Sequence, residues 1–194
     1  MEAVAYSAFE TLRNGRRAEI RALRPDDRDG LISAIGRVSA QSLYRRFFSA
    51  KRHFTAKEIS FFLNVDFTSH VALVAVIEEG GRSVIAGGGR YIVVGAGQAE
   101  AAFAVVDQYQ GQGIGAVLLR HLVAIARAAG LRELVAEVLP ENVAMLRVFE
   151  KSGLPLRRKR AARVVEIALE LNPPPGPRQP PSPSGPDRRA AEKE

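Results

Sequence analysis

The 194-residue chain contains no cysteine and only three histidines, and both shortages narrow its chemistry. Without thiols there can be no disulfide, no thiolate nucleophile and no cysteine-ligated zinc. The histidines, His53, His70 and His121, lie far apart in the sequence and match no metal-ligand spacing. We therefore expect no metal site.

Long apolar runs are also missing. No segment approaches the ~20 apolar residues that a membrane-spanning helix needs, and the first residues lack the basic and apolar pattern of a signal peptide. We therefore expect a cytoplasmic protein with no membrane partner. The net charge of +7 favours anionic ligands or acidic surfaces. By itself the charge does not choose among nucleic acid, a membrane surface and a phosphorylated ligand.

Hydrophobic patterning predicts a single α/β domain that covers residues 19–171. Helical spacing of apolar residues predicts two longer helices, 117–129 and 143–152, after several short ones between residues 25 and 63. Ser39 and Thr55 are the expected cap residues of two of the short helices. Three consecutive glycines, 87–89, predict a bulge or a close backbone approach inside a strand. Alternating or continuous apolar residues predict strands at 19–24, 71–77, 83–94, 99–106, 134–139 and 163–171.

Three other segments are predicted to lie outside the packed elements. Residues 1–18 are expected to form a loose or lightly docked N-terminal segment. Residues 172–194 are rich in proline and are expected to be disordered, because such a stretch cannot bury enough surface to fold. The charged run Arg157–Arg160 is expected to be a solvated hairpin loop, and the alternative is a basic surface for acidic proteins, a ligand phosphate or nucleic acid. No aromatic residue interrupts this run, which argues against a single-stranded nucleic acid as partner.

A glycine-rich stretch carries the strongest functional signal. It reads Gln110-Gly111-Gln112-Gly113-Ile114-Gly115-Ala116 and lies between a predicted strand and a predicted helix. Glycines let a backbone approach a pyrophosphate closely, and the free N–H groups of the first helical turn point at it. The stretch therefore predicts a site for a phosphorylated ligand.

Two common phosphate motifs fit this stretch poorly. Gly111, Gly113 and Ala116 match the dinucleotide fingerprint G-x-G-x-x-A, but Asp107–Gln110 separates them from the preceding strand. Glu137 is only roughly placed for the acidic residue that this fingerprint needs, and too few residues follow for a doubly wound domain. The nucleoside-triphosphate P-loop fails because no Lys-Ser/Thr pair follows the glycines.

The template Gln/Arg-x-x-Gly-x-Gly/Ala fits Gln110–Gly115 at every position, and here the chain resembles the GNAT acetyltransferase superfamily. A second segment, residues 139–153, is similar to that family's Asn-x-x-Ala/Met…Phe/Tyr-Glu-Lys-x-Gly-Phe motif. The resemblance covers about residues 19–171. It implies a mostly antiparallel central sheet, splayed at two parallel strands, with helices on both faces.

The resemblance also implies that acetyl-CoA binds where the two parallel strands splay apart. The amides of Gln112–Ala116 would hold the pyrophosphate, and the backbone of Val105 and Val106 would pair with the pantetheine arm. Asn142 would hydrogen-bond the same arm, although a plain helix N-cap explains this residue equally well. The residues implied in acetyl-CoA binding are Val105, Val106, Gln110, Gly111, Gln112, Gly113, Ile114, Gly115, Ala116, Asn142 and Phe149.

Glu100 is the candidate catalytic residue. Acetylation of an amine needs a base, because a protonated amine has no lone pair to attack a thioester. Strand alternation places Glu100 on one face with Ala102 and Ala104, a small apolar row with room for a substrate, where we expect the carboxylate to be buried. An exposed glutamate at a strand start is the alternative. Glu100 ahead of the glycine loop is similar to the bacterial protein-lysine acetyltransferase branch, in which the matching Glu is the general base.

Two further features bear on that branch. The run Ser42–Phe48 resembles its early helices and implies an acceptor-site wall, with Arg45 or Arg46 guiding the substrate, although core packing of the phenylalanines is the simpler interpretation. Many GNAT enzymes use a Tyr on the later helix as the acid toward the leaving thiolate, and here Phe149 takes its place. The thiolate then leaves unprotonated, or Ser152 or water donates the proton.

Together these patterns predict an N-acetyltransferase that carries acetyl from acetyl-CoA to a primary amine, with protein lysine as the preferred acceptor. The alternative acceptor is a small amine such as a polyamine, an amino acid or a drug. A hypothesis of another class is a non-catalytic CoA-binding sensor or adaptor.

Overall fold

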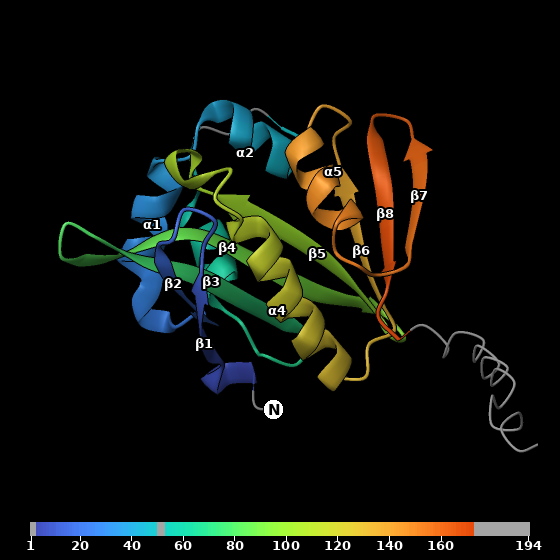
Figure 1. Cartoon of the computed structure of the whole chain (residues 1–194), viewed down its shortest axis with the longest axis horizontal. Coiled ribbons are helices and arrows are strands. Elements are labelled where there is room, and N and C mark those ends of the chain that lie inside the picture. The colour runs from blue at the N-terminus through green and yellow to red at the C-terminus, as the bar shows by residue number, and fades with distance from the viewer. Residues whose placement is uncertain (1–2, 50–52, 173–194) are drawn as a thin grey trace, which may run out of the picture.

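The computed structural model describes residues 3–49 and 53–172, and it places their eight strands in one sheet (Figure 1). The strand order is β1-β2-β3-β4-β5-β6-β8-β7, and every neighbouring pair is antiparallel except β5 and β6. The strands span Ser7–Thr11 (β1), Arg17–Ala22 (β2), His70–Glu79 (β3), Arg82–Gly95 (β4), Gln98–Val105 (β5), Glu133–Val138 (β6), Leu156–Ala161 (β7) and Val164–Glu170 (β8).

The parallel pair splits the sheet. Gln98, Ala99 and Glu100 of β5 pair with Glu133, Leu134 and Val135 of β6, and there the ladder ends. Beyond it β5 continues as Ala101–Val105 and β6 as Ala136–Val138 with no register between them. We call these two diverging segments the fork. The predicted fold, a mostly antiparallel sheet splayed at two parallel strands, is confirmed.

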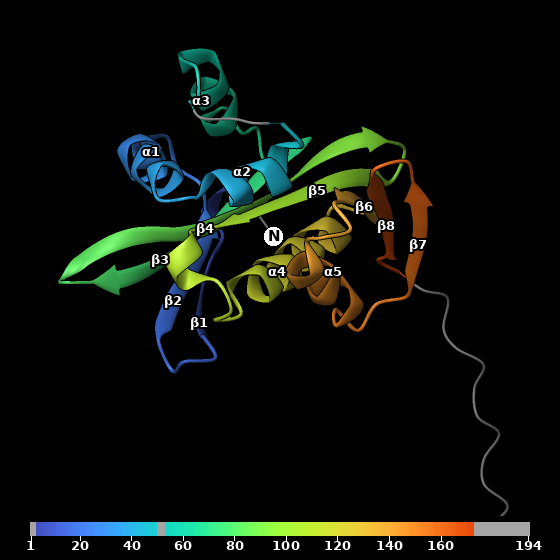
Figure 2. The same ribbon diagram turned by 90° about the horizontal axis from the view of Figure 1, so that it is seen from above.

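Helices cover both faces of the sheet (Figure 2). On one face lie α1, α2 and α3, and on the other lie α4 and α5. Ser39 and Thr55 accept hydrogen bonds from Ser42 N and Glu58 N, so the expected caps of α2 and α3 are confirmed. The helices are Arg28–Gly36 (α1), Ala40–Phe47 (α2), Ala56–Leu63 (α3), Ile114–Ala128 (α4) and Val143–Glu150 (α5), with 3-10 turns at Ala3–Ala5, Pro25–Asp27 and Asp107–Tyr109.

The core lies where both layers press on the middle of the sheet. Every residue of β3 from His70 to Ile77 is buried, as expected of a central strand with helices on both sides. In β4 a Cβ on Gly87 would lie 2.9 Å from the Ala104 carbonyl oxygen, and a Cβ on Gly89 would lie 2.8 Å from the Phe103 ring. The predicted close approach at the glycine triplet is therefore confirmed, and it lets α4 pack tightly on β4.

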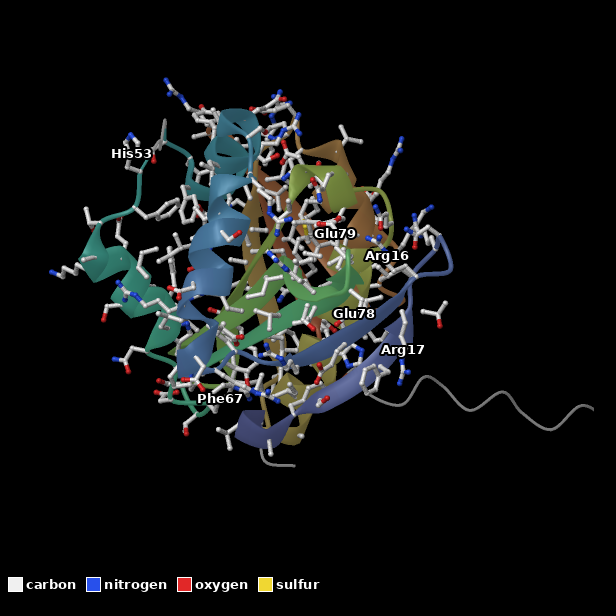
Figure 3. All side chains as sticks on the ribbon, turned by 90° about the vertical axis from the view of Figure 1, so that its left-hand side faces the viewer. Arg16, Arg17, His53, Phe67, Glu78 and Glu79 are labelled. Carbon is white, nitrogen blue, oxygen red and sulfur yellow. The ribbon has the colours of Figure 1, made fainter. Side chains whose placement is uncertain are left out.

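The N-terminal segment is more ordered than the sequence suggested. Ser7–Thr11 pairs with Arg17–Arg21 as an antiparallel hairpin, and Figure 3 shows Arg16 and Arg17 at the start of its second strand. His121 of α4 contacts the Tyr6 hydroxyl and lies 2.9 Å from Glu10 Oε1, which fixes this hairpin to the helix. The prediction of a loose segment was wrong for these residues.

The charged run Arg157–Arg160 was also misjudged, because it forms most of the edge strand β7 rather than a loop. Arg157 pairs with Glu133, and Arg158 Nη1 lies 3.0 Å from Glu150 Oε1. Charged side chains are common on edge strands, where they discourage pairing with another chain.

Three expectations concern absences or lie beyond the description. Within residues 3–49 and 53–172, no helix has the length and apolar character needed to cross a membrane. The same residues contain no cluster of three or more His, Asp or Glu side chains suited to a metal ion. The expected disorder of the proline-rich tail concerns residues 173–194, which lie outside the described residues.

Candidate functional site

A cleft of about 430 Å³ opens at the fork. Residues of α2, β5, the glycine loop, the start of α4, the end of β6 and α5 line it. Among the residues predicted from sequence, Gln112 and Val106 do not line this cleft. The residues that the structure does bring together there are Glu100, Val105, Gln110, Gly111, Gly113, Ile114, Gly115, Ala116, Asn142 and Phe149.

The N-terminus of α4 supplies the anion-binding part of the cleft. Gly113 precedes the helix with a φ of +95°, a left-handed conformation that glycine adopts without strain. The first hydrogen bond into the helix runs from Val117 N to Gly113 O at 3.0 Å. The N–H groups of Ile114, Gly115 and Ala116 therefore have no acceptor inside the helix, and the positive end of its dipole adds to them. This is the arrangement expected of a pyrophosphate site.

The two glutamines of the loop shape it from within. Gln110 Nε2 donates to Val105 O, Asp107 Oδ1 and Ser42 Oγ, each at 3.1 Å. Gln112 Nε2 donates to Gln108 O at 3.2 Å. Both side-chain amides are thus engaged with the protein, which indicates that they position the loop.

The backbone N–H groups of Val105 and Val106, both expected to pair with the pantetheine arm, point in opposite directions. Val106 N donates to Ala86 O at 2.9 Å, so this N–H points to β4. The prediction that Val106 pairs with the arm was therefore wrong for its N–H. Because successive N–H groups of a strand point to opposite sides, the N–H of Val105 points toward the fork. It is the available donor at this position.

Asn142 and Phe149 come from α5 and its cap. Asn142 Oδ1 accepts from Met145 N at 3.2 Å, so the residue is a helix N-cap. Asn142 also lines the cleft, so its Nδ2 group is available to donate to a ligand bound there. Phe149 is buried and meets the Phe103 ring edge-on, with 6.0 Å between centroids. Phe149 carries no proton to donate, and Ser152 is not among the cleft-lining residues.

Glu100 stands at the point where β5 and β6 separate. It is the last β5 residue paired with β6, and its side chain is exposed in the cleft. The expectation of a buried carboxylate was therefore wrong, although its predicted place at the site is consistent with the cleft. The charge of Glu100 acts on Arg46 of α2. Burial lowers the pKa of the Arg46 guanidinium, and the negative charge of Glu100 offsets part of this effect.

Basic side chains around the cleft were mostly missed in the sequence. Arg13 lies on the turn between β1 and β2, and its Cγ is 3.3 Å from where a Cβ of Gly113 would lie. Arg13 N also donates to Gln112 O at 3.0 Å, so this turn braces the glycine loop. Nothing in the sequence pattern separates Arg13 from its neighbours Arg16 and Arg17. The basic residues that line the cleft are Arg13, Arg45, Arg46, Arg147 and Lys151.

Comparison with known proteins agrees with this geometry. The model of the acetyltransferase (GNAT) family matches residues 38–154. The chain belongs to this family. Members of this family transfer an acetyl group from acetyl-CoA. By family membership, this GNAT chain is therefore an acetyl-CoA-dependent acetyltransferase.

Three relatives of this acetyltransferase show how far the likeness extends. Acetyltransferase PA5475 of Pseudomonas aeruginosa is 34% identical over 137 residues, which are 70% of this chain and 74% of that protein. Acetyltransferase Pat of Mycolicibacterium smegmatis is 31% identical over 73% of this chain, but the match spans only 42% of that longer protein. The crystal structure of the GNAT domain of S. lividans PAT has a TM-score of 0.77 and 36% identity, and the match covers 84% of this chain and 96% of that one.

Proposed function

We propose that this acetyltransferase acetylates the ε-amine of protein lysines and that Glu100 is the general base. One observation carries the proposal. Glu100 projects from the root of the fork into the same cleft that the free amides at the start of α4 line. A base and an anion site thereby lie in one cleft of about 430 Å³, within the size range of small-molecule sites.

The donor would lie along the fork with its pyrophosphate on the amides of Ile114, Gly115 and Ala116. The Val105 N–H and the Asn142 Nδ2 group would hydrogen-bond the pantetheine arm, which would then extend the sheet like an added strand. The basic side chains that line the cleft complement the phosphates of CoA. The thioester would then lie close to the root of the fork.

Glu100 would take a proton from the acceptor ammonium, directly or through water, and free its lone pair. The amine nitrogen would attack the thioester carbonyl carbon, forming the C–N bond and placing negative charge on the carbonyl oxygen. The Val105 N–H is the donor best placed to stabilise that charge. Collapse would break the C–S bond and release CoA as a thiolate, while the amide nitrogen gives up its second proton. Water would carry that proton to the thiolate, because Phe149 has none to give.

Two observations support a protein as the acceptor. Tyr44 and Phe48 of the α2 region keep 41% and 38% of their surface exposed, and Phe48 lines the cleft, so an apolar rim is present for a protein to contact. The chain is also similar to proteins named Pat and PAT, and its run Ser42–Phe48 resembles the bacterial protein-lysine acetyltransferase branch.

The test is acetyl transfer from labelled acetyl-CoA to two panels, one of lysine-containing proteins and peptides and one of polyamines, amino acids and drugs. Mass spectrometry would locate the acetyl group. We expect it on lysine ε-nitrogens, with a higher kcat/KM than for any small amine. If the label enters only small amines, the acceptor is a small amine and not a protein lysine. Tight CoA binding without turnover on either panel would favour a sensor or adaptor.

A further inference from the structure

A second cavity, of about 100 Å³, lies between the sheet and helices α1, α2 and α3. Its walls are apolar except for two charged side chains, Arg46 from α2 and Arg90 from β4. A cavity this apolar is an unfavourable place for charge, because an ion removed from water needs a partner of opposite sign. Two like charges on its wall therefore call for a physical reason.

The described part of the protein brings little negative charge to these two guanidinium groups, since only the charge of Glu100 acts on Arg46. Within residues 3–49 and 53–172, neither Arg46 nor Arg90 is in an ion pair with a carboxylate. Arg90 Nη1 donates to His70 Nε2 at 3.0 Å, and Arg90 also lies over the Phe62 ring at 4.8 Å from its centroid. Burial and the charge of Arg46 lower the pKa of Arg90 to about 10, so it remains charged at neutral pH.

His70 cannot supply the missing negative charge. An imidazole carries no negative charge, its ring nitrogen accepts the Arg90 hydrogen bond, and burial together with the charge of Arg90 lowers its pKa. Arg46 in turn stacks on Phe47 at 4.8 Å, a contact that leaves its charge in place. Arg90 therefore has no ion-pair partner among residues 3–49 and 53–172, and Arg46 has only the charge of Glu100 to offset its own.

The cavity opens toward the proposed chemistry. Arg46, Ala102 and Ala104 line both the cavity and the cleft that holds Glu100. Ala102 pairs with Arg90 across β4 and β5, and Glu100 pairs with Ile92 two residues along. Glu100 and Arg90 are thus diagonal neighbours on one face of the sheet, with Cα atoms roughly 7–8 Å apart.

The two substrates approach from different sides. The start of α4 lies on the opposite face from α2, so the pyrophosphate of the donor would occupy the α4 side. Glu100 shares the α2 face with Arg90, Ala102 and Ala104, which places the amine on that side. An acceptor whose nitrogen meets Glu100 would then have its neighbouring atoms next to Arg46 and Arg90.

We propose that Arg46 and Arg90 form a carboxylate-binding site for the acceptor, so that the enzyme prefers amines that carry a carboxylate close to the reacting nitrogen. This inference rests on the proposed function of Glu100. A carboxylate fits because it pairs with guanidinium groups in a planar, two-pronged geometry and restores the missing charge. It can come from a free amino acid or from an acidic group beside a lysine in a peptide.

The activity test compares acceptors that differ in one charge. One set of acceptors consists of ω-amino acids of increasing chain length, each compared with its carboxamide. The other set consists of lysine peptides with either Glu or Gln next to the lysine. We expect the carboxylate member to have a kcat/KM higher by about 10–100-fold, the range of a desolvated charge-assisted hydrogen bond. The set that shows the larger preference identifies whether the carboxylate comes from a free amino acid or from a peptide. Equal kcat/KM within every pair would overturn the proposal.

Variants separate the site from its surroundings. Arg90→Gln should raise KM for carboxylate acceptors by about 10–100-fold and change kcat/KM for the carboxamides by less than about threefold. Arg82→Gln, an exposed arginine on the same strand, is the matched control and should change neither. If Arg90→Gln fails to fold, the same comparison of carboxylate and carboxamide acceptors is made with Arg46→Gln, which should lose the preference for the carboxylate.

A binding measurement keeps this inference distinct from the assignment of Glu100. Calorimetric titration of the preferred ω-amino acid into the CoA-loaded Glu100→Gln variant needs no turnover. Retained binding that Arg90→Gln abolishes would support the carboxylate site even if Glu100 proved not to be the base. Binding unaffected by Arg90→Gln would refute the site even if Glu100→Gln removed activity.

Discussion

The two faces of the sheet build their halves of the site in different ways. On the α4 face, the consecutive residues Ile114–Ala116 present backbone N–H groups, and one stretch of sequence is enough to identify the kind of ligand they bind. On the α2 face, Glu100, Arg46 and Arg90 come from three different elements. The sheet register places Glu100 near Arg90, and the packing of α2 on the sheet adds Arg46. The donor side is thus encoded locally, whereas the acceptor side is encoded by the tertiary fold. Variants on one face should then affect one substrate.

The largest effect is expected at the root of the fork. Glu100→Gln keeps the shape of the side chain but removes the base, and general-base catalysis contributes about 10²–10⁴-fold. We expect kcat to fall by that factor while the Kd for CoA, measured by calorimetry, stays the same. Glu137→Gln removes the other carboxylate that lines the cleft and should lower kcat at most a few-fold. An equal loss in both variants would show that the cleft needs negative charge rather than a base at Glu100.

The next effect tests the donor face alone. Gly113→Asp introduces a carboxylate at the anion site, and we expect the Kd for CoA to rise by about 100-fold or more. Gly81→Asp is the control, because Gly81 also has a positive φ, +75°, but lies at the tip of the β3–β4 hairpin with open space around it. Both variants place a side chain at a left-handed φ, +95° at Gly113 and +75° at Gly81. A similar loss of CoA affinity in both would attribute it to strain and remove the pyrophosphate assignment.

A smaller effect concerns the residue that the sequence pattern did not mark. Arg13→Ala should raise the Kd for CoA by about 3–10-fold, as expected for one partly solvated contact to a phosphate. Arg17→Ala is the comparison, since Arg17 stacks on Phe9 at 3.8 Å and is not part of the cleft. Acceptor KM should be unaffected in either variant. A change in acceptor KM with Arg13→Ala would mean that the two faces are not separate.

The smallest effect links the donor face to the N-terminal hairpin through pH. Burial lowers the pKa of His121 below its ordinary value of 6.5. The stability due to neutral His121 is therefore complete above pH 6.5 and is lost as the pH falls through the folded-state pKa. We expect Tm to decrease on acidification from pH 7.5 to 5.5, and to decrease less in His121→Gln.

A control residue and a second histidine complete this pH test. His53 is exposed at the side of the molecule seen in Figure 3, so His53→Gln should leave the slope of Tm against pH as it is. His70 is buried and its pKa is also lowered, so part of the slope should remain in His121→Gln. An unchanged slope in His121→Gln would show that the contact of His121 with Tyr6 and Glu10 does not govern acid stability.

The sequence predicted the central elements because their apolar residues repeat with the period of a strand or a helix. The cap residues Ser39 and Thr55 and the close approach at Gly87 were predicted because each has a local chemical cause. The glycine loop was recognised for the same reason. Such features need no knowledge of distant neighbours.

The features that were missed depend on distant neighbours. The strand β1 gains its stability from pairing with β2 and from the contact of Tyr6 and Glu10 with His121. The run Arg157–Arg160 forms a strand because β8 and acidic side chains lie beside it. The exposure of Glu100 follows from the splitting of β5 from β6, which alternation within β5 cannot show. The cavity with Arg46 and Arg90 likewise arises only from the packed fold.

The most direct measurement of the central claim is a crystal structure of the protein with CoA. The account predicts the pyrophosphate on the amides of Ile114, Gly115 and Ala116, the arm along the Val105 backbone, and the thiol at the root of the fork on the α4 side. Glu100 would then face the thiol from the α2 side. A CoA molecule bound instead along helices α1, α2 and α3, or with its thiol away from Glu100, would contradict the account.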